Sequence, residues 1–487
     1  MKYSIIGIFA AIIMVFSVFA ATAFDTESRV NRYQQHLESR QPYEGCSCDK
    51  SELCTHLPLV LIETGGNTIP GEPITDEFGN ELGYVTTAEN EEMITSKISV
   101  ISDETKNHHP SDEPDLESNI LIRIRGNSSR YFNKKNYLIR LTDENGEYQN
   151  KEMLGMDSHY EWALHGPYLD KSLIRNYMWY NIAGEFMEYA PNVRFCEVII
   201  DGKYQGLYVM TETITNGDNC RVNISEPVDG TDKTGYVLRL DRGSHTQIRN
   251  IETFTNYTYR NLQKIDIKYP RSGKLTPELA NAIAQDFSYF EKSLYSYDYD
   301  TENYGYSQNI NVQSFADYFI INEFTSNYDA GWLSTYIYKD IGGKYNMVIW
   351  DFNSACDNYA AYAFPAEGFQ MQNVVWYFML MKDERFNQEI INRYKKLRET
   401  YLSDEYLNQY IDDTVAYLGD AIDRNFEVWQ NTFEMDMLKP SERNIKSHEE
   451  AIQQMKDFIS ERGAWMDENI EIIKQYGHES KNKKFNH

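Results

Sequence analysis

The sequence predicts a mixed fold of the α+β class, with a β-rich amino-terminal part and a mostly helical carboxy-terminal part. Between about residues 58 and 241, apolar side chains form short runs or alternate along the chain, which is typical of strands. Between about residues 275 and 478 they recur at helical spacing. Strands followed by helices, rather than alternating βαβ units, favour an α+β fold. Hydrophobic residues make up 41% of the 487 residues, which is enough for a large core.

The strand candidates are short apolar or alternating runs that end at turn residues. They lie at residues 57–62, 94–101, 121–125, 137–141, 198–200, 206–210 and 236–240. The dipeptide Asp201-Gly202 stands between two of these runs. Because Asp-Gly favours the turn that joins antiparallel strands, this pair predicts a β-hairpin.

The helix candidates lie mainly in the second part of the chain. They cover residues 170–188, 275–294, 312–327, 386–401, 404–429 and 447–475. Ser447 and Glu450 have the spacing of a capping box, in which the two side chains bond to free backbone N–H groups at a helix start. A hairpin over residues 335–350, with Gly342-Gly343 at its turn, is expected to interrupt the helices.

The amino terminus has the features of a secretory signal peptide. Met1-Lys2 is basic, residues 5–20 carry no charge, and small residues precede a cleavage site after Ala23. We therefore expect a signal peptide over residues 1–23 and a secreted protein without membrane insertion after cleavage. Residues 24–57 are predicted to be a polar, cysteine-containing linker, residues 58–478 a single domain, and residues 479–487 a disordered tail.

The charge of the chain limits its partners. Its formal net charge is −27 at pH 7. Such a surface repels nucleic-acid phosphates and anionic lipids, so neither is expected to be the main partner.

The chain has six cysteines, an even number that suits a secreted protein with disulfides. Cys46, Cys48 and Cys54 lie close together in sequence, whereas the other three are scattered at Cys196, Cys220 and Cys356. The Cys-x-Cys-x5-Cys group could bind a metal, but no fourth ligand follows nearby in sequence. We therefore favour disulfides over a metal site. Glycosylation sequons begin at Asn127, Asn223 and Asn256.

Two aspartates have the positions expected of a phosphoryl-transfer site. Asp329 follows a predicted helix, and Asp351 follows a predicted strand, with one hairpin between them. In such a site one carboxylate orients or accepts the proton of the attacking hydroxyl, and another holds a metal ion against the phosphates. The alternative is that each is a turn residue, since aspartate favours turns. The pairing favours the functional interpretation.

A second group consists of the loop Arg125-Gly126-Asn127-Ser128-Ser129 and the lysines Lys134 and Lys135. Backbone N–H groups of a Gly/Ser-rich loop can approach phosphate closely, and a lysine adds a positive charge. The alternative is an ordinary hairpin loop with exposed lysines. Glu212, at the end of a strand, could pair with a lysine over a nucleotide or be a surface charge, and Asp170 could cap a helix.

Four segments, in this order along the chain, carry a resemblance to a known family. They are Arg125-Gly126-Asn127-Ser128-Ser129 with Lys134, Lys135, Tyr137 and Ile139; Asp170, Ser172, Arg175 and Asn176; Gly206, Tyr208 and Glu212; and Asn327, Asp329 and Trp350-Asp351-Phe352. Together they resemble the spore-coat protein H (CotH) family of secreted atypical protein kinases over approximately residues 58–475.

The resemblance implies a divergent, two-lobed protein-kinase-like fold. It also implies transfer of the γ-phosphate of ATP, with Mg²⁺ or Mn²⁺, to a hydroxyl of an extracellular or coat protein. By similarity, Asp329 is the catalytic aspartate, and Asp351 and Asn353 are the metal ligands. The nucleotide would be bound by Arg125, Asn127, Ser128, Lys134, Lys135 and Glu212, with either lysine in contact with phosphate.

Two positions depart from the family pattern. Asn353 stands where the family commonly has a second aspartate, and Arg140 stands where it usually has a lysine. An amide oxygen can still bind Mg²⁺, although it brings less charge. The alternative function is therefore a non-catalytic CotH-like surface or coat protein, or an adhesin, built on the same fold.

Overall fold

A computed structural model of the chain describes residues 32–38, 46–48, 51–217, 221–252, 254, 263–482 and 484. The predicted signal peptide, Cys220, Asn256 and residues 485–487 lie outside the described residues. Residues 35–487 form one compact unit, and the description below concerns that unit alone.

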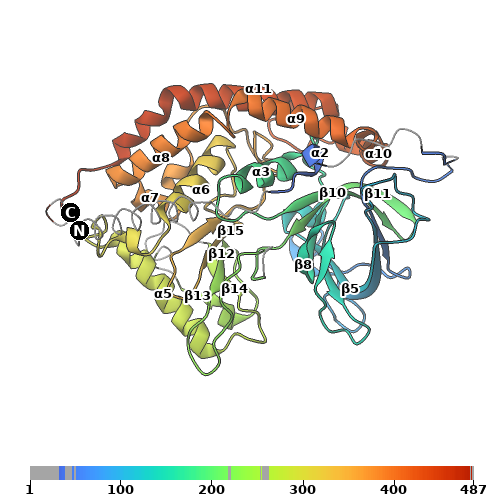
Figure 1. The fold of residues 1–487 in the computed structure, drawn as a ribbon, viewed down its shortest axis with the longest axis horizontal. Coiled ribbons are helices and arrows are strands. Elements are labelled where there is room, and N and C mark those ends of the chain that lie inside the picture. Colours follow the sequence, from blue (N-terminus) through green and yellow to red (C-terminus); the bar gives the residue numbers. More distant parts are fainter. Residues whose placement is uncertain are drawn as a thin grey trace, which may run out of the picture. The chain divides into compact units, whose positions relative to one another are not determined.

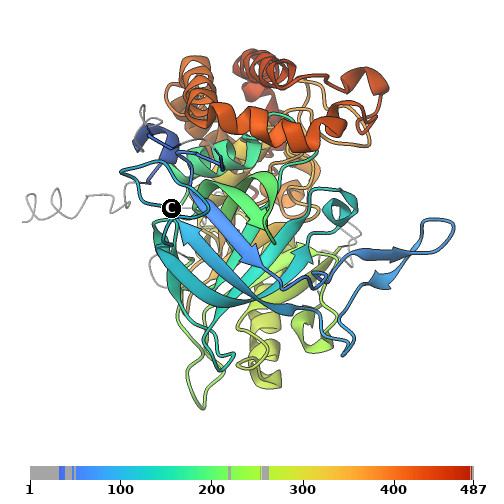
Figure 2. The ribbon, with the colours of Figure 1, turned by 90° about the vertical axis from the view of Figure 1, so that its right-hand side faces the viewer.

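Seven strands of the amino-terminal part close into a barrel, which the sequence had not predicted (Figure 2). In sheet order they are β1 (Leu59–Glu63), β10 (Val193–Ile200), β11 (Lys203–Glu212), β9 (Glu161–His165), β6 (Asn136–Thr142), β5 (Leu116–Arg125) and β4 (Ile94–Ile101). β1 and β10 are parallel, and the other pairs are antiparallel. The predicted hairpin turn at Asp201-Gly202 joins β10 to β11, and both turn residues have positive φ.

Side-chain alternation decides which residues of the barrel face outward. On β5, the buried isoleucines Ile120, Ile122 and Ile124 belong to the barrel core. Because successive side chains of a strand point to opposite faces, Arg123 and Arg125 lie on the outer face. The same alternation on β6 and β9 adds Arg140, Glu161 and His165 to that face. A run of charged residues therefore covers one outer side of the barrel.

Two short hairpins extend from the barrel. They consist of β2 (Pro73–Thr75) with β3 (Glu81–Tyr84), and β7 (Lys151–Met153) with β8 (Met156–His159). The β2–β3 hairpin projects away from the barrel strands in Figure 2.

A second, five-stranded sheet combines strands from both parts of the chain (Figure 1). Its order is β13 (Asn250–Ile251), β14 (Lys264–Tyr269), β12 (Tyr236–Asp241), β15 (Thr335–Lys339) and β16 (Asn346–Val348). The hairpin predicted over residues 335–350 is confirmed as β15–β16. It completes the sheet begun by β12, which the sequence had placed in the β-rich part.

The helices largely follow the prediction. They are α2 (Gln35–Glu38), α3 (Arg175–Gly184), α5 (Pro277–Tyr295), α6 (Val312–Phe324), α7 (Tyr377–Leu380), α8 (Glu384–Arg398), α9 (Asp404–Leu418), α10 (Asp420–Trp429) and α11 (His448–Asn469). Short 3₁₀ turns occur at η1 (Ser128–Tyr131), η2 (Gln247–Arg249), η3 (Tyr306–Gln308), η4 (Met371–Asn373), η5 (Gln430–Phe433), η6 (Ser441–Arg443) and η7 (Ile470–Tyr476).

The single helix predicted over residues 404–429 is two helices. Gly419 separates α9 from α10 and has a φ of 46°, a conformation that glycine adopts readily and that ends a helix. The predicted cap at Ser447 is confirmed, since its hydroxyl accepts a bond from the Glu450 N–H at 3.2 Å. The Glu450 side chain bonds to the N–H of Lys446 rather than of Ser447.

Part of the predicted linker is folded against the domain. The side chain of Gln35, in α2, exchanges two hydrogen bonds with the backbone of Phe195 in β10. These two bonds satisfy the buried backbone N–H and carbonyl of Phe195 together with the buried amide of Gln35. The folded unit therefore begins before residue 58.

The mixed α+β class is confirmed, and the kinase-like two-lobed arrangement stays a prediction. Within the described part of the chain, no helix combines the length and the hydropathy needed to cross a bilayer.

Candidate active site

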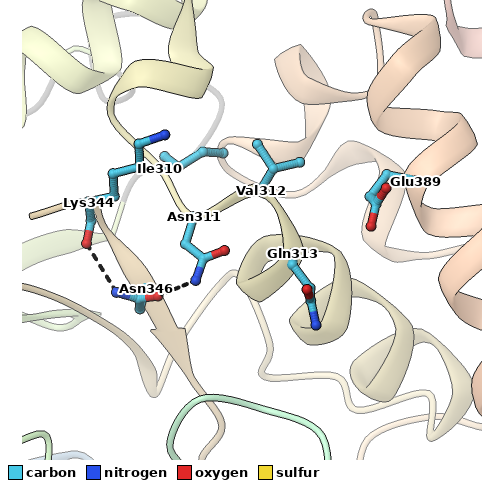
Figure 3. A pocket seen from close by; sticks show the side chains of 7 residues that line it. All are labelled: Ile310, Asn311, Val312, Gln313, Lys344, Asn346 and Glu389. Atoms are coloured by element: carbon cyan, nitrogen blue, oxygen red, sulfur yellow. Dashed lines mark hydrogen bonds between the residues drawn. The ribbon is translucent and has the colours of Figure 1, made fainter. Parts of the chain in front are cut away.

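The helix and the strand that lead to the two predicted aspartates start side by side. Ile310 and Tyr345 form a parallel bridge, and the N–H of Met347 donates to the Ser314 hydroxyl at 2.9 Å. Figure 3 shows a third link, in which the Asn311 amide donates to the Asn346 side chain at 2.9 Å. Because α6 and β16 start together and run in the same direction, their far ends lie on the same side of the unit.

The hollow drawn in Figure 3 lies where α6 and β16 begin, and neither Asp329 nor Asp351 lines it. It has a volume of about 470 Å³. Its seven lining residues are Ile310, Asn311, Val312, Gln313, Lys344, Asn346 and Glu389. None of them is a predicted site residue, so we assign this hollow no catalytic role.

The far ends of α6 and β16 are also tied together, and there the two aspartates lie. The N–H of Cys356, just after Asp351, donates to the carbonyl of Thr325, just after α6, at 2.7 Å. Asp329 begins a tight turn, in which its carbonyl accepts the N–H groups of Trp332 and Leu333. These anchors bring Asp329 and Asp351 to the same side of the unit, where the Asp329 charge acts on Asp351.

Helix α3 fixes the backbone around Asp351. The Tyr180 hydroxyl accepts the Asp351 N–H at 2.8 Å, and the Asn176 side-chain oxygen accepts the Phe352 N–H at 2.7 Å. Asp351 has a φ of 63°, which is uncommon for a residue other than glycine. Such backbone strain persists where surrounding contacts enforce it, and it concentrates at functional sites.

The motif of Asp170, Ser172, Arg175 and Asn176 also contacts the segment that follows Asp351. The buried Arg175 pairs with Asp170 at 2.5 Å, and its Nε donates to the Ala355 carbonyl at 3.0 Å. Asp170 also accepts the backbone N–H of Ser172, as a capping residue does. The motif therefore positions the backbone that follows Asp351, through Asn176 at Phe352 and Arg175 at Ala355.

The environment of the two aspartates favours their protonated forms. Burial, with the nearby Asp329 carboxylate, raises the pKa of Asp351 to about 7, although Arg125 opposes the shift. Burial also raises the pKa of Asp329 to about 6; Arg242 opposes this and Asp241 adds to it. Enclosure of like charges in this way is typical of sites that bind cations or transfer protons.

Asp241 is a third carboxylate at the site, and sequence reasoning missed it. It is the last residue of β12, and its charge acts on both Asp329 and Asp351. It pairs with Arg239 at 3.4 Å and with Arg242 at 3.1 Å. An acidic residue at the end of a predicted strand was the available signal, but nothing local connected it to Asp329 and Asp351, which follow 88 and 110 positions later.

Arg125 is the predicted nucleotide-binding residue that the structure brings next to Asp351. Its guanidinium lies over the Trp350 ring, 5.3 Å from the ring centre. Its positive charge opposes the rise in the pKa of Asp351 that burial causes. Trp350 stacks in turn on Tyr180 at 5.8 Å. The arginine is thereby held beside the carboxylate by an aromatic contact as well as by charge.

Further cations lie on the outer face of the barrel, on β14 and just after β14. Arg140 pairs with Glu161 at 2.8 Å, and Arg271 with Glu161 at 3.7 Å. Burial and the Arg239 charge lower the pKa of Lys268 to about 8, and burial with Arg140 lowers that of Arg271 to about 10. Glu161 lies close to all three cations and offsets part of their charge.

The two predicted lysines have partners elsewhere. Lys134 is buried, and its ammonium donates to the Leu207 carbonyl and to the Asn425 side chain, both at 2.6 Å. Lys135 pairs with Glu72 at 2.8 Å and donates to the Arg130 carbonyl. Lys134 therefore fastens β11 to α10. Between the two, Lys135 is the less buried.

The loop from Arg125 to Ser129 is held in shape by its own residues. Gly126 has a φ of 109°, and an added Cβ would lie 2.0 Å from the Ser129 hydroxyl, so only glycine fits there. Its carbonyl accepts the Arg130 Nε at 2.7 Å. Asn127 precedes the 3₁₀ turn η1, and Ser128, its first residue, is exposed. The loop leaves a polar edge open to solvent.

Glu212 lies in the core rather than on an edge. It is fully buried at the end of β11 and pairs with the buried Arg221 at 3.2 Å. It also accepts the Asn192 N–H at 2.9 Å. Neither role left open for this residue matches its contacts: its carboxylate is enclosed rather than on the surface, and its cationic partner is Arg221 rather than a lysine.

The predicted metal ligands offer the oxygen atoms that Mg²⁺ and Mn²⁺ prefer. Asp351 supplies a carboxylate whose repulsion with the catalytic candidate Asp329 a bound cation would reduce. Asn353 is partly exposed, two residues after Asp351, and its amide nitrogen donates to Ser354 at 3.3 Å, leaving the amide oxygen for a ligand. The donor set therefore fits a hard divalent cation.

A cavity of about 330 Å³ lies beside the Asp329 turn. Its lining includes Asn327, Tyr328, Trp332, Phe364 and Phe369. The side-chain oxygen of Asn327 is buried with no hydrogen-bond partner among the described residues. The cavity thus combines aromatic walls with a polar atom that a ligand could satisfy.

Comparison with protein families found one match. The family described as CotH kinase protein matches residues 122–466, which is more than half of the chain. The chain belongs to the CotH kinase protein family. The match spans the outer barrel arginines, Asp241, Asp329 and Asp351, so the whole candidate site lies within the CotH region. A comparison with individually curated proteins gave no match.

Proposed function

We propose that this CotH protein is a secreted protein kinase, which transfers the γ-phosphate of ATP to a hydroxyl of an extracellular or coat protein. One observation carries the proposal: the enclosed Asp351 carboxylate, close to Asp329, lies beside the Arg125 guanidinium, which is held over the ring of Trp350. A metal-bound triphosphate has the complementary charges for both groups.

Each group has a distinct part in the proposed reaction. Asp329 orients the acceptor hydroxyl and accepts its proton, and a pKa of about 6 leaves it ionised at neutral pH. Asp351 and Asn353 would hold Mg²⁺ or Mn²⁺, which when bound neutralises phosphate charge. Arg125, with Lys135 and the exposed loop at Asn127 and Ser128, would contact the phosphates.

Three residues support these groups indirectly. Tyr180 and Asn176 hold the backbone at Asp351 and Phe352, and Lys134 fastens the barrel to α10. Arg140, which replaces the lysine usual in the family, is paired with Glu161. We therefore propose that Arg140 contributes to the electrostatic potential around the nucleotide and does not contact phosphate directly.

Phosphate transfer from labelled ATP tests the proposal. The full chain lacking the predicted signal peptide is incubated with Mg²⁺ or Mn²⁺ and with dephosphorylated casein as acceptor. Labelling of the chain itself or of casein is expected, and Asp329→Asn should remove it. Absence of metal-dependent labelling, or labelling unchanged in Asp329→Asn, contradicts the proposal.

Asn353 favours a second candidate, a non-catalytic surface or coat protein. With an amide in place of an acid, the site carries less negative charge for a metal. Titration with ATP separates the candidates. Metal-dependent binding that weakens in Asp351→Asn supports the kinase, whereas no binding in the presence of Mg²⁺ or Mn²⁺ supports the surface protein.

A further inference from the structure

The structure brings a histidine to the three cysteines of the amino-terminal segment. Sγ atoms of Cys46, Cys48 and Cys54 and a ring nitrogen of His109 all lie within 4.8 Å of one another. Each of the four side chains is partly buried. His109 belongs to the connection between β4 and β5, more than fifty residues from Cys54, which is why the sequence alone offered no fourth ligand.

A backbone bridge sets the two segments against each other. The N–H of Thr55 donates to the His108 carbonyl at 3.1 Å, and the N–H of His108 donates to the Thr55 carbonyl at 2.7 Å. In an antiparallel bridge the flanking residues also face one another. Cys54 and His109 are those flanking residues, so their approach is a consequence of main-chain pairing.

The bridge is itself anchored. The two ring nitrogens of the buried His108 contact the carbonyls of Leu57 and Asp103, each at 2.7 Å. The Ser111 hydroxyl donates to Glu52 at 2.6 Å. The segment before β1 and the β4–β5 connection are thus joined by contacts on both sides of the cluster.

Outer contacts orient the cluster as they do around metal ligands. The Nδ1 of His109 lies 3.4 Å from the Asp112 carboxylate, while Nε2 lies 3.4 Å from the Cys46 sulfur. A carboxylate on one ring nitrogen that leaves the other for a metal is a recurrent arrangement in metalloproteins. The Asn107 amide donates to the Cys54 sulfur at 3.4 Å.

From this geometry we propose that Cys46, Cys48, Cys54 and His109 bind one Zn²⁺ ion in a structural, tetrahedral site. Bond lengths of about 2.3 Å to sulfur and about 2.1 Å to nitrogen place tetrahedral ligand atoms roughly 3.6–3.8 Å apart. The observed spread of up to 4.8 Å needs only a small contraction. Binding displaces the three thiol protons to solvent, and the ion closes the link between the amino-terminal segment and the barrel.

Disulfide formation is the competing chemistry for these cysteines. The described cysteines Cys46, Cys48, Cys54, Cys196 and Cys356 form no disulfide in the structure. A disulfide would use two of the three clustered sulfurs, and it would give no role to His109 or to its carboxylate partner. The three sulfurs and the histidine nitrogen lie within 4.8 Å of one another. This arrangement favours a metal site over the disulfide that the sequence had favoured.

Metal content and cysteine redox state, measured on the same sample, test the proposal. The full secreted chain, purified without reductant or chelator, should contain about one zinc per chain by elemental mass spectrometry. Peptide mapping after alkylation in denaturant with chelator should recover Cys46, Cys48 and Cys54 as thiols. Zinc below about 0.2 per chain, or a disulfide that includes any of the three, overturns the proposal.

Variants connect the metal to the histidine. His109→Ala should lose at least about tenfold in zinc affinity, while His245→Ala, at an exposed histidine outside the cluster, should keep wild-type zinc. Chelator should lower the melting temperature of the wild type but not of His109→Ala. Wild-type zinc affinity in His109→Ala overturns the assignment.

A spectrum of the wild type decides the matter if His109→Ala does not fold. Co²⁺ is exchanged for the bound metal under anaerobic conditions, and the visible absorption is recorded. Tetrahedral d–d bands with thiolate-to-cobalt charge transfer support the site. A spectrum without thiolate charge transfer overturns it.

Discussion

The hydroxyl of Tyr180 accepts the backbone N–H of Asp351 at 2.8 Å, and so joins the middle of α3 to the residue proposed to hold the metal. The ring of Tyr180 also stacks on Trp350, the residue before Asp351. One buried side chain thereby fixes both the backbone and the direction of the segment that leaves β16. A positive φ is uncommon for a residue other than glycine, although aspartate adopts it more readily than most, and these contacts hold Asp351 in that conformation.

Removal of this hydroxyl should affect activity more than folding. In Tyr180→Phe the N–H of Asp351 loses its partner, which costs about 1 kcal/mol of unfolding free energy. We expect kcat to fall about tenfold, since small displacements of a reacting group are costly. Because the residue acts through position, the KM for the protein acceptor should stay nearly constant.

Steady-state kinetics and denaturant unfolding measure these effects. Tyr208→Phe is the matched control, because the Tyr208 hydroxyl is buried with no hydrogen-bond partner among the residues described. Equal losses of kcat in the two variants would show that the contact with Asp351 has no special role.

Asp329→Asn should remove phosphate transfer and preserve nucleotide binding. The amide cannot accept the proton of the acceptor hydroxyl, so we expect at least about a 100-fold loss in kcat. ATP affinity, measured by titration, should change by less than about threefold, because Asp329 is proposed to contact the acceptor hydroxyl rather than the phosphates. Asp232→Asn, at an exposed position, is the control and should behave as wild type. A large loss of ATP affinity in Asp329→Asn would instead make that aspartate a binding residue.

The pH dependence of kcat/KM should report the ionisation of Asp329. Its pKa in the free protein is raised to about 6, and the proton acceptor must be ionised. Activity should therefore be lost as the pH falls below about 6 and should level off above it, in a profile that belongs to the coupled pair of aspartates. A profile that is flat between pH 5 and 8 would contradict this role.

Asp351→Asn should stabilise the metal-free protein at pH 8 and weaken ATP binding. The pKa of Asp351 is raised to about 7 by burial and by Asp329, above the usual value of about 3.9 for aspartate. The folded state therefore binds the proton more tightly than the unfolded state does. Wild-type stability must then decrease as the pH rises from about 4 to 7, and it stays lower above 7.

Asparagine removes this repulsion and tolerates the left-handed backbone. We expect a melting temperature about 1–3 °C higher than wild type at pH 8 in chelator, and little difference at pH 4. Scanning calorimetry at both pH values measures this change. Asp351→Ala serves as a comparison, because it removes the charge but adds backbone strain. A lower melting temperature for Asp351→Asn at pH 8 would show that its charge is stabilised in the folded state.

Arg125→Gln should weaken ATP binding about tenfold, an effect typical of the loss of one charge-assisted contact to phosphate. The guanidinium beside Asp351 and over Trp350 is already fixed, so little ordering is needed when the anion binds. Lys97→Gln, at an exposed position on β4, removes the same charge elsewhere and is the control. If both variants bind ATP equally, the effect is one of net charge and not of this site.

Local patterns in the sequence determined most elements of this protein. Alternation placed β4 at residues 94–101, and the Asp201-Gly202 turn placed the β10–β11 hairpin. The Asp329 and Asp351 positions followed from where a helix and a strand end. These features depend on a few neighbouring residues, so the chain carries their signal within short windows. The break at Gly419 was also present in the sequence, but helical spacing continued across it.

Tertiary structure alone decided which of these residues meet. Barrel closure, the approach of Asp241 to the two aspartates, and the approach of His109 to three cysteines each join residues far apart in sequence. From the sequence, Lys134 is either a phosphate ligand or an exposed lysine of a hairpin loop. In the structure it is buried, and its ammonium donates to Asn425, 291 residues away. Burial and partner choice set the energy of a charged group, and both depend on long-range packing that has no local pattern.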